Sequence, residues 1–182
     1  GIHIGMLVLP PLCVVVQRLP NHIAALVIAS TALILALQPD AGTSAAWAYA
    51  ILILVLFSGS AALMAAGVFA VGCAVYTVIQ AINGAADLPS VAFVEGVFGD
   101  LFTAAPLMFF PAVVFALWLT YRTATIAEYE SEGRALQSLT YGLFLAAIIG
   151  NYPTPLVGYG AAPILGYCLA LGLLEMKRPA GK

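Results

Sequence analysis

Charged residues are scarce in this sequence. Six of the 182 residues are Lys or Arg and eight are Asp or Glu, so charged side chains make up 8% of the chain. A soluble domain carries about a quarter. Hydrophobic residues make up 63%, and the mean hydropathy is +1.07. This composition predicts an integral membrane protein. The net charge of −2, without a basic run, gives no indication of a nucleic-acid partner.

The sequence also lacks the period-two alternation of membrane β-strands. Helices are then the structure that satisfies the backbone in lipid, so the predicted fold class is all-α. The three cysteines, Cys13, Cys73 and Cys168, are far apart, have no CxxC spacing and are interpreted as packing residues. The two histidines, His3 and His22, would lie at opposite membrane faces, which argues against a haem or metal site between them. We predict neither a cofactor nor a metal.

Long apolar stretches separated by Pro, Gly and charge clusters predict about seven membrane-spanning helices in a single domain, 1–182. A crossing helix needs about 20 apolar residues, and about 17 to 25 are tolerated. The predicted spans are 2–17, 21–38, 44–58, 60–82, 101–121, 135–150 and 160–176. The paired prolines Pro10 and Pro11 should kink the first span. The break between the third and fourth spans depends on the short SGS turn at 58–60.

The positions of the basic residues predict the orientation, since Lys and Arg gather in short cytoplasmic loops. With seven spans and the N-terminus outside, all six lie on one face, together with the C-terminus: Arg18, Arg122, Arg134, Lys177, Arg178 and Lys182. The same orientation places Asp40, Asp87, Glu95 and Asp100 outside. The cytoplasmic acids at 128, 130 and 132 are interpreted as part of a solvated loop or helix end.

Three segments on the predicted outer face have unusual compositions. QPDAGTS occupies 38–44, a mixed acidic and apolar loop occupies 83–100, and a segment rich in Pro and Gly occupies 150–163. The middle segment should lie along the membrane interface, and the last should follow a fixed, non-helical path. Asp40 has two interpretations. It caps the helix that follows Pro39, or it faces a polar cavity or a ligand head group.

Two of these segments resemble motifs of one protein family. QPDAGTS resembles the Gln-Pro-Asp-Leu-Gly-Thr motif of the SEDS family (shape, elongation, division and sporulation), and PTPLVGYGAAP, at 153–163, is similar to the family's Pro-Leu-Pro-Phe-Val-Ser-Tyr-Gly-Gly-Ser motif. Family members have ten spans, so the seven here correspond to the last seven. Because the chain begins with Gly and lacks the features of a signal peptide, we expect a fragment or a processed product.

The resemblance implies a function at the outer leaflet of the bacterial cytoplasmic membrane. Family members polymerise peptidoglycan from a polyprenyl-linked disaccharide, lipid II, with a transpeptidase partner, in cell-shape and division processes. In this sequence Ala92 stands at the position of the family's catalytic Asp, and the outer loop is much shorter. Glu95 and, next, Asp87 are the nearest acids able to act as a general base. The implied head-group site comprises Asp40, Gly42, Asn151, Tyr152, Pro155, Tyr159 and Gly160.

Two interpretations of the function remain open. One is a reduced SEDS-like enzyme, or the C-terminal part of one, that binds a polyprenyl-linked cell-wall precursor. The other is a non-catalytic membrane subunit that binds a lipid, or that stabilises or assembles a larger membrane complex. The retained motifs favour the first, and Ala92 with the short loop favours the second. A transporter ranks last, since no charge falls in the middle of a predicted span.

Overall fold

The computed structural model describes residues 4–38, 40–84, 102–126, 130–149 and 161–176. The helices are α1 (Ile4–Val16), α2 (Asn21–Leu37), α3 (Ala41–Leu56), α4 (Ala61–Ile82), α6 (Pro106–Ile126), α7 (Glu130–Ile149) and α8 (Ala161–Glu175). No strand occurs within these ranges. The predicted all-α class is therefore confirmed for the part of the chain that is described.

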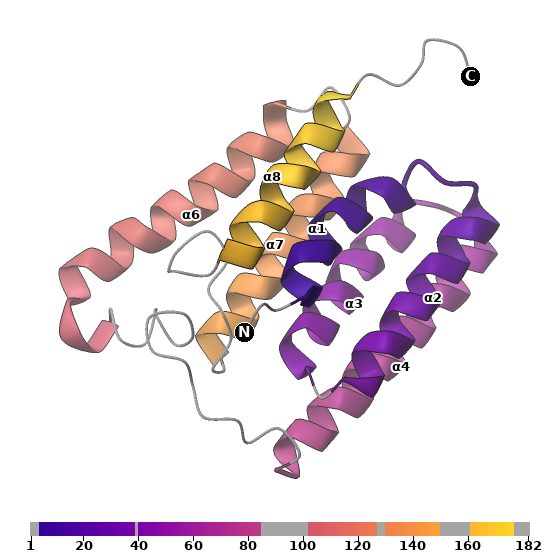
Figure 1. The fold of residues 1–182 in the computed structure, drawn as a ribbon, viewed down its shortest axis with the longest axis horizontal. Helices are drawn as coiled ribbons and strands as arrows, with labels where there is room; N and C mark the ends of the chain where they lie inside the picture. The colour runs from indigo at the N-terminus through magenta and orange to yellow at the C-terminus, as the bar shows by residue number, and fades with distance from the viewer. Residues whose placement is uncertain (1–3, 39, 85–101, 127–129, 150–160, 177–182) are drawn as a thin grey trace.

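Successive helices run in alternating directions, so that the bundle has two distinct ends (Figure 1). One end carries Arg18, Arg122 and Arg134, at the end of α1, near the end of α6 and at the beginning of α7; we call it the basic end. The other end carries Asp40 before α3, together with the starts of α6 and α8 and the ends of α4 and α7; we call it the Asp40 end.

Helix α3 lies at the centre of the packing. It contacts α7 and α4 extensively and α2 to a lesser degree, whereas α1 packs mainly on α8 and α7, and α6 packs on α7. The interface between α3 and α7 is close because both helices present small residues. A Cβ at Gly142 would lie 2.8 Å from the Cα of Ala46. Such small residues allow two helix backbones to approach each other closely.

Helix α1 continues through Pro10 and Pro11 and ends at Val16. Proline has no N–H, so the carbonyl groups four residues earlier, those of Met6 and Leu7, receive no donor from their own helix. Gly166 of α8 packs against these two carbonyls. A Cβ at this position would lie 2.5 Å from the Met6 oxygen and 2.7 Å from the Leu7 oxygen. The two prolines and one glycine thus form a close crossing between α1 and α8.

Several helix boundaries differ from the predicted spans. Helix α3 begins at Ala41 and not at 44, because Asp40 caps it. A break separates α3 from α4 near the SGS turn, where Gly59 has a φ of +63° that favours glycine. Helix α7 begins at Glu130, five residues before the predicted span. Its first turns contain Glu132, a charged residue that is fully buried.

Large apolar side chains cover much of the outer surface. Leu26 on α2, Val68 on α4 and Leu107 on α6 are at least 70% exposed. Within the described ranges, α4 is the one helix long and apolar enough to cross a membrane, and α1, α2, α3, α8 and 106–118 of α6 are shorter apolar helices. Exposed apolar surface of this extent marks a face that contacts lipid or another protein.

Candidate functional site

Asp40 is the one acidic site residue of the sequence analysis that the structure describes. Its Oδ1 accepts a hydrogen bond of 3.1 Å from the backbone N–H of Thr43, which makes it the N-cap of α3. Its own N–H donates to the Gln38 carbonyl at 2.6 Å. The capping interpretation of Asp40 is thus confirmed. The side chain is only partly buried, so capping and contact with a ligand are compatible.

Three polar side chains are buried directly behind this cap. Gly42 is also buried, and α3 continues with Thr43, Ser44 and Trp47, which are at most 2% exposed. The Thr43 and Ser44 hydroxyls and the Trp47 indole N–H have no hydrogen-bond partner within the described part of the chain. An unmade hydrogen bond of a buried polar group costs about 1–3 kcal/mol. The first two turns of α3 therefore give the Asp40 end a polar interior.

The other predicted site residues lie outside the described residues. These are Glu95 and Asp87 as candidate acids, Ala92 at the family's catalytic position, and Asn151, Tyr152, Pro155, Tyr159 and Gly160 of the head-group site. The two helices on either side of residues 150–160 both reach the Asp40 end of the bundle. Helix α7 ends there at Ile149, and α8 begins there at Ala161 (Figure 1).

An apolar groove lies between α3, α6 and α7. Its volume is about 390 Å³, within the range of about 300–1,000 Å³ typical of small-molecule sites. The lining residues are Tyr49, Val113, Ala116, Leu117, Tyr141, Phe144, Leu145 and Ile148. Leu145 and Ile148 are about half exposed, at 52% and 55%, so the groove opens at the surface of the bundle. Ile148 lies in the last turn of α7, so the groove extends towards the Asp40 end.

Two phenol groups provide the polar atoms of this groove. The Tyr141 hydroxyl accepts a 2.8 Å hydrogen bond from the Gln137 side-chain amide, one turn earlier on α7. Tyr49 projects from the middle of α3 and is 40% exposed. Such a groove can hold a long apolar chain, with one or two polar contacts along its length. No sequence motif marks this groove, because its residues come from three helices.

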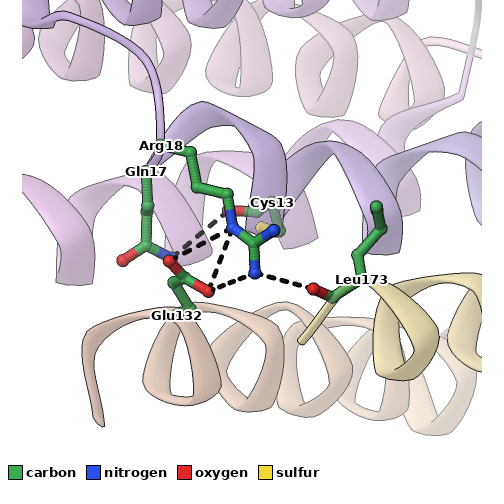
Figure 2. A network of polar contacts seen from close by, with 5 residues as sticks. All are labelled: Cys13, Gln17, Arg18, Glu132 and Leu173. Atoms are coloured by element: carbon green, nitrogen blue, oxygen red, sulfur yellow. Dashed lines mark hydrogen bonds and ion pairs between the residues drawn. The ribbon is translucent and has the colours of Figure 1, made fainter. Parts of the chain in front are cut away.

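The basic end contains a charged network that the sequence did not predict (Figure 2). The Arg18 guanidinium forms an ion pair with the Glu132 carboxylate, with Nη2 3.0 Å from Oε2, and also donates to the Leu173 carbonyl at 2.7 Å. Glu132 is fully buried. The interpretation of this acid as part of a solvated segment is therefore wrong, because α7 starts earlier than predicted and turns Glu132 inward.

Weaker contacts surround the ion pair. The Gln17 side-chain amide donates to the Cys13 carbonyl at 3.3 Å (Figure 2). The Cys13 thiol lies 3.9 Å from the Ala135 carbonyl. The network therefore ties the end of α1 to the start of α7 and the end of α8. Its charges neutralise each other, so its role is to join helices. The sequence gives little indication of this ion pair, because Arg18 and Glu132 are 114 residues apart.

The described residues contain no group of three or more His, Cys, Asp or Glu side chains that could hold a metal ion. Comparison with models of known protein families, with curated proteins and with solved structures gives no match. The resemblance of QPDAGTS and PTPLVGYGAAP to SEDS motifs therefore stays a prediction drawn from those residues. Any function must be inferred from the geometry and the composition of this chain.

Proposed function

We propose that this chain is a multi-pass protein of the bacterial cytoplasmic membrane that binds a polyprenyl-linked cell-wall precursor. The Asp40 end faces outside and the basic end faces the cytoplasm. Alternating helix directions, exposed apolar faces and the collection of Arg18, Arg122 and Arg134 at one end support this orientation. Several of the helices are short for a full crossing, so tilt or local thinning of the bilayer accompanies insertion.

The apolar groove between α3, α6 and α7 is the observation that carries the proposal. A polyprenyl chain needs an extended apolar surface, and the lining of the groove is almost entirely hydrocarbon and aromatic. The groove extends towards the Asp40 end, where α3 has its polar interior and α7 ends at Ile149. The head group then sits at the outer surface and the chain lies along the bundle.

Binding is tested with the purified protein in nanodiscs and undecaprenyl phosphate as the probe. Leu145→Trp places a large ring in the groove and should weaken binding at least about tenfold, because the ring occupies space that the polyprenyl chain would fill. Leu169→Trp, on the exposed face of α8 and outside the groove, is the matched control and should bind like the unchanged protein. Equal binding by both variants would refute the groove as the site.

Catalysis is a separate matter from binding. Asp40 is engaged as a helix cap, and Ala92 replaces the acid that the family resemblance would require. We therefore propose that this chain binds the precursor and presents it to a partner enzyme, such as a transpeptidase-associated polymerase. Incubation with lipid II should give no glycan. Glycan synthesis that disappears in Glu95→Ala but persists in Asp40→Ala would instead establish a glycosyltransferase.

A second function, assembly of a larger membrane complex, is favoured by a notch between α2 and α4. Its volume is about 510 Å³, and its lining includes Leu33, Phe69, Gly72 and Tyr76. A Cβ at Gly72 would meet nothing within 4 Å, so a partner helix can approach closely there. A membrane protein that co-purifies at fixed stoichiometry should be released by Gly72→Leu and retained by Ala65→Leu, an exposed site on the same helix.

A further inference from the structure

Three polar groups in the first two turns of α3 have no hydrogen-bond partner within the described residues. They are the Thr43 and Ser44 hydroxyls and the Trp47 indole N–H, on side chains that are at most 2% exposed. Buried polar groups in proteins are almost always hydrogen-bonded, either to protein or to ordered water. Three such groups this close together on one helix therefore point to a bound molecule.

The other buried hydroxyls of the described helices are satisfied in a different way. Each donates to a carbonyl of its own helix, three or four residues earlier, as the Thr140 hydroxyl does to the Leu136 carbonyl at 2.7 Å. The two hydroxyls of α3 make no such bond, although the Asp40 carbonyl lies four residues before Ser44 and accepts its N–H. They are therefore available to a partner outside their helix.

A glycine of α1 leaves space next to one of these hydroxyls. A Cβ placed on Gly5 would have the Thr43 side chain as its nearest neighbour, with Cγ2 at 3.4 Å and Oγ1 at 3.5 Å. These are ordinary van der Waals distances, so this position can hold an atom. Gly5 lies in the first turn of α1 and is only partly buried, so solvent reaches the edge of this space.

The chemistry of the three groups suits water better than an anion or a sugar. The indole N–H only donates, whereas each hydroxyl both donates and accepts. One water can accept two of these bonds and donate a third, which gives the about three hydrogen bonds typical of a buried water. An anion would lie close to the Asp40 carboxylate that caps the same helix, and the buried side chains leave no entry for a sugar.

We propose that Thr43, Ser44 and Trp47 bind an ordered internal water beside Gly5, where α3 meets the first turn of α1. The indole and one hydroxyl donate to the water, and the water donates to the other hydroxyl. It stabilises the Asp40 end by satisfying buried groups. None of the three residues lines the groove between α3, α6 and α7, so the water site does not depend on the proposed precursor.

The test is radiolytic labelling of the purified full chain in detergent, because hydroxyl radicals formed from a bound water oxidise side chains next to it even when they are buried. Mass spectrometry should find Trp47 oxidised, along with the exposed Trp118 as the positive control. The double variant Thr43→Val, Ser44→Ala should lower the labelling of Trp47 about tenfold, since two of the hydrogen bonds to the water are lost. Thr140→Val is the matched control and should leave that labelling unchanged, because its hydroxyl bonds to its own helix.

Two single variants separate loss of the water from loss of the fold. Gly5→Ala keeps all three polar groups, and its methyl group fits beside Thr43 but takes the space of the water. The labelling of Trp47 should therefore fall while the helix content, measured by circular dichroism, stays the same. Thr43→Ser keeps a hydroxyl and should keep the labelling. An unlabelled Trp47 in the unchanged protein, or undiminished labelling in the double variant or in Gly5→Ala, would overturn the proposal.

Discussion

At the scale of single residues, the described chain shows two ways of keeping a carboxylate in an apolar bundle. Asp40 accepts the Thr43 N–H at a helix start, and Glu132 is neutralised by Arg18. Asp40→Ala removes the cap of α3 and should lower the free energy of unfolding by about 1 kcal/mol, within the range of about 0.5–2 for such caps. Asp40→Asn keeps an acceptor oxygen and should retain most of that stability. Denaturant titration in detergent measures both.

Glu132→Ala should have a larger effect than loss of the cap. It leaves the Arg18 guanidinium without its carboxylate at a site where α1, α7 and α8 meet, and breaking a buried pair in this way costs about 3–5 kcal/mol. Arg18 is 23% exposed, which places the expected loss near the lower value. Glu175→Ala, at the exposed end of α8, is the control and should be nearly neutral. Equal stability of the two variants would contradict a joining role for the pair.

At the scale of helices, the crossing of α1 and α8 depends on Gly166. A methyl group there would collide with the Met6 and Leu7 carbonyls, which belong to backbone and cannot move aside as a flexible side chain does. Gly166→Ala should therefore destabilise the bundle by about 1–3 kcal/mol, as overpacked sites do. Gly172→Ala, on the same helix with nothing within 4 Å of the new methyl group, should be neutral or stabilising. Thermal unfolding of the two variants gives the comparison.

These elements also show what the sequence could and could not predict. Apolar length and helix breakers indicated the helical class, and the Pro-Asp pair before α3 indicated its cap. Hydropathy could not predict that Gly166 packs against the Met6 and Leu7 carbonyls, because that contact depends on the register between two helices far apart in the sequence. Hydropathy also could not predict the ion pair between Arg18 and Glu132, since a charged residue near a helix end is expected to be solvated unless its partner is known. The groove between α3, α6 and α7 likewise exists only in three dimensions.

At the scale of the whole molecule, the segregation of charge makes the orientation testable. Three described arginines lie at the basic end, so the positive-inside tendency predicts that this end of the proposed membrane bundle faces the cytoplasm. In a background without Cys13, Cys73 and Cys168, a single cysteine at Ser58 reports the basic end, and one at Asn83 reports the Asp40 end. Both positions are exposed. An impermeant maleimide added to intact cells should label Asn83→Cys and not Ser58→Cys.

Permeabilised cells should label both positions, which controls for reactivity at Ser58→Cys. The opposite pattern in intact cells would place the basic end outside. The Asp40 end would then lose access to an externally presented precursor. Labelling of both positions in intact cells would contradict a membrane-spanning bundle altogether. The orientation therefore decides the proposal for the precursor, because the Asp40 end and the basic end lie at opposite ends of the same antiparallel helices (Figure 1).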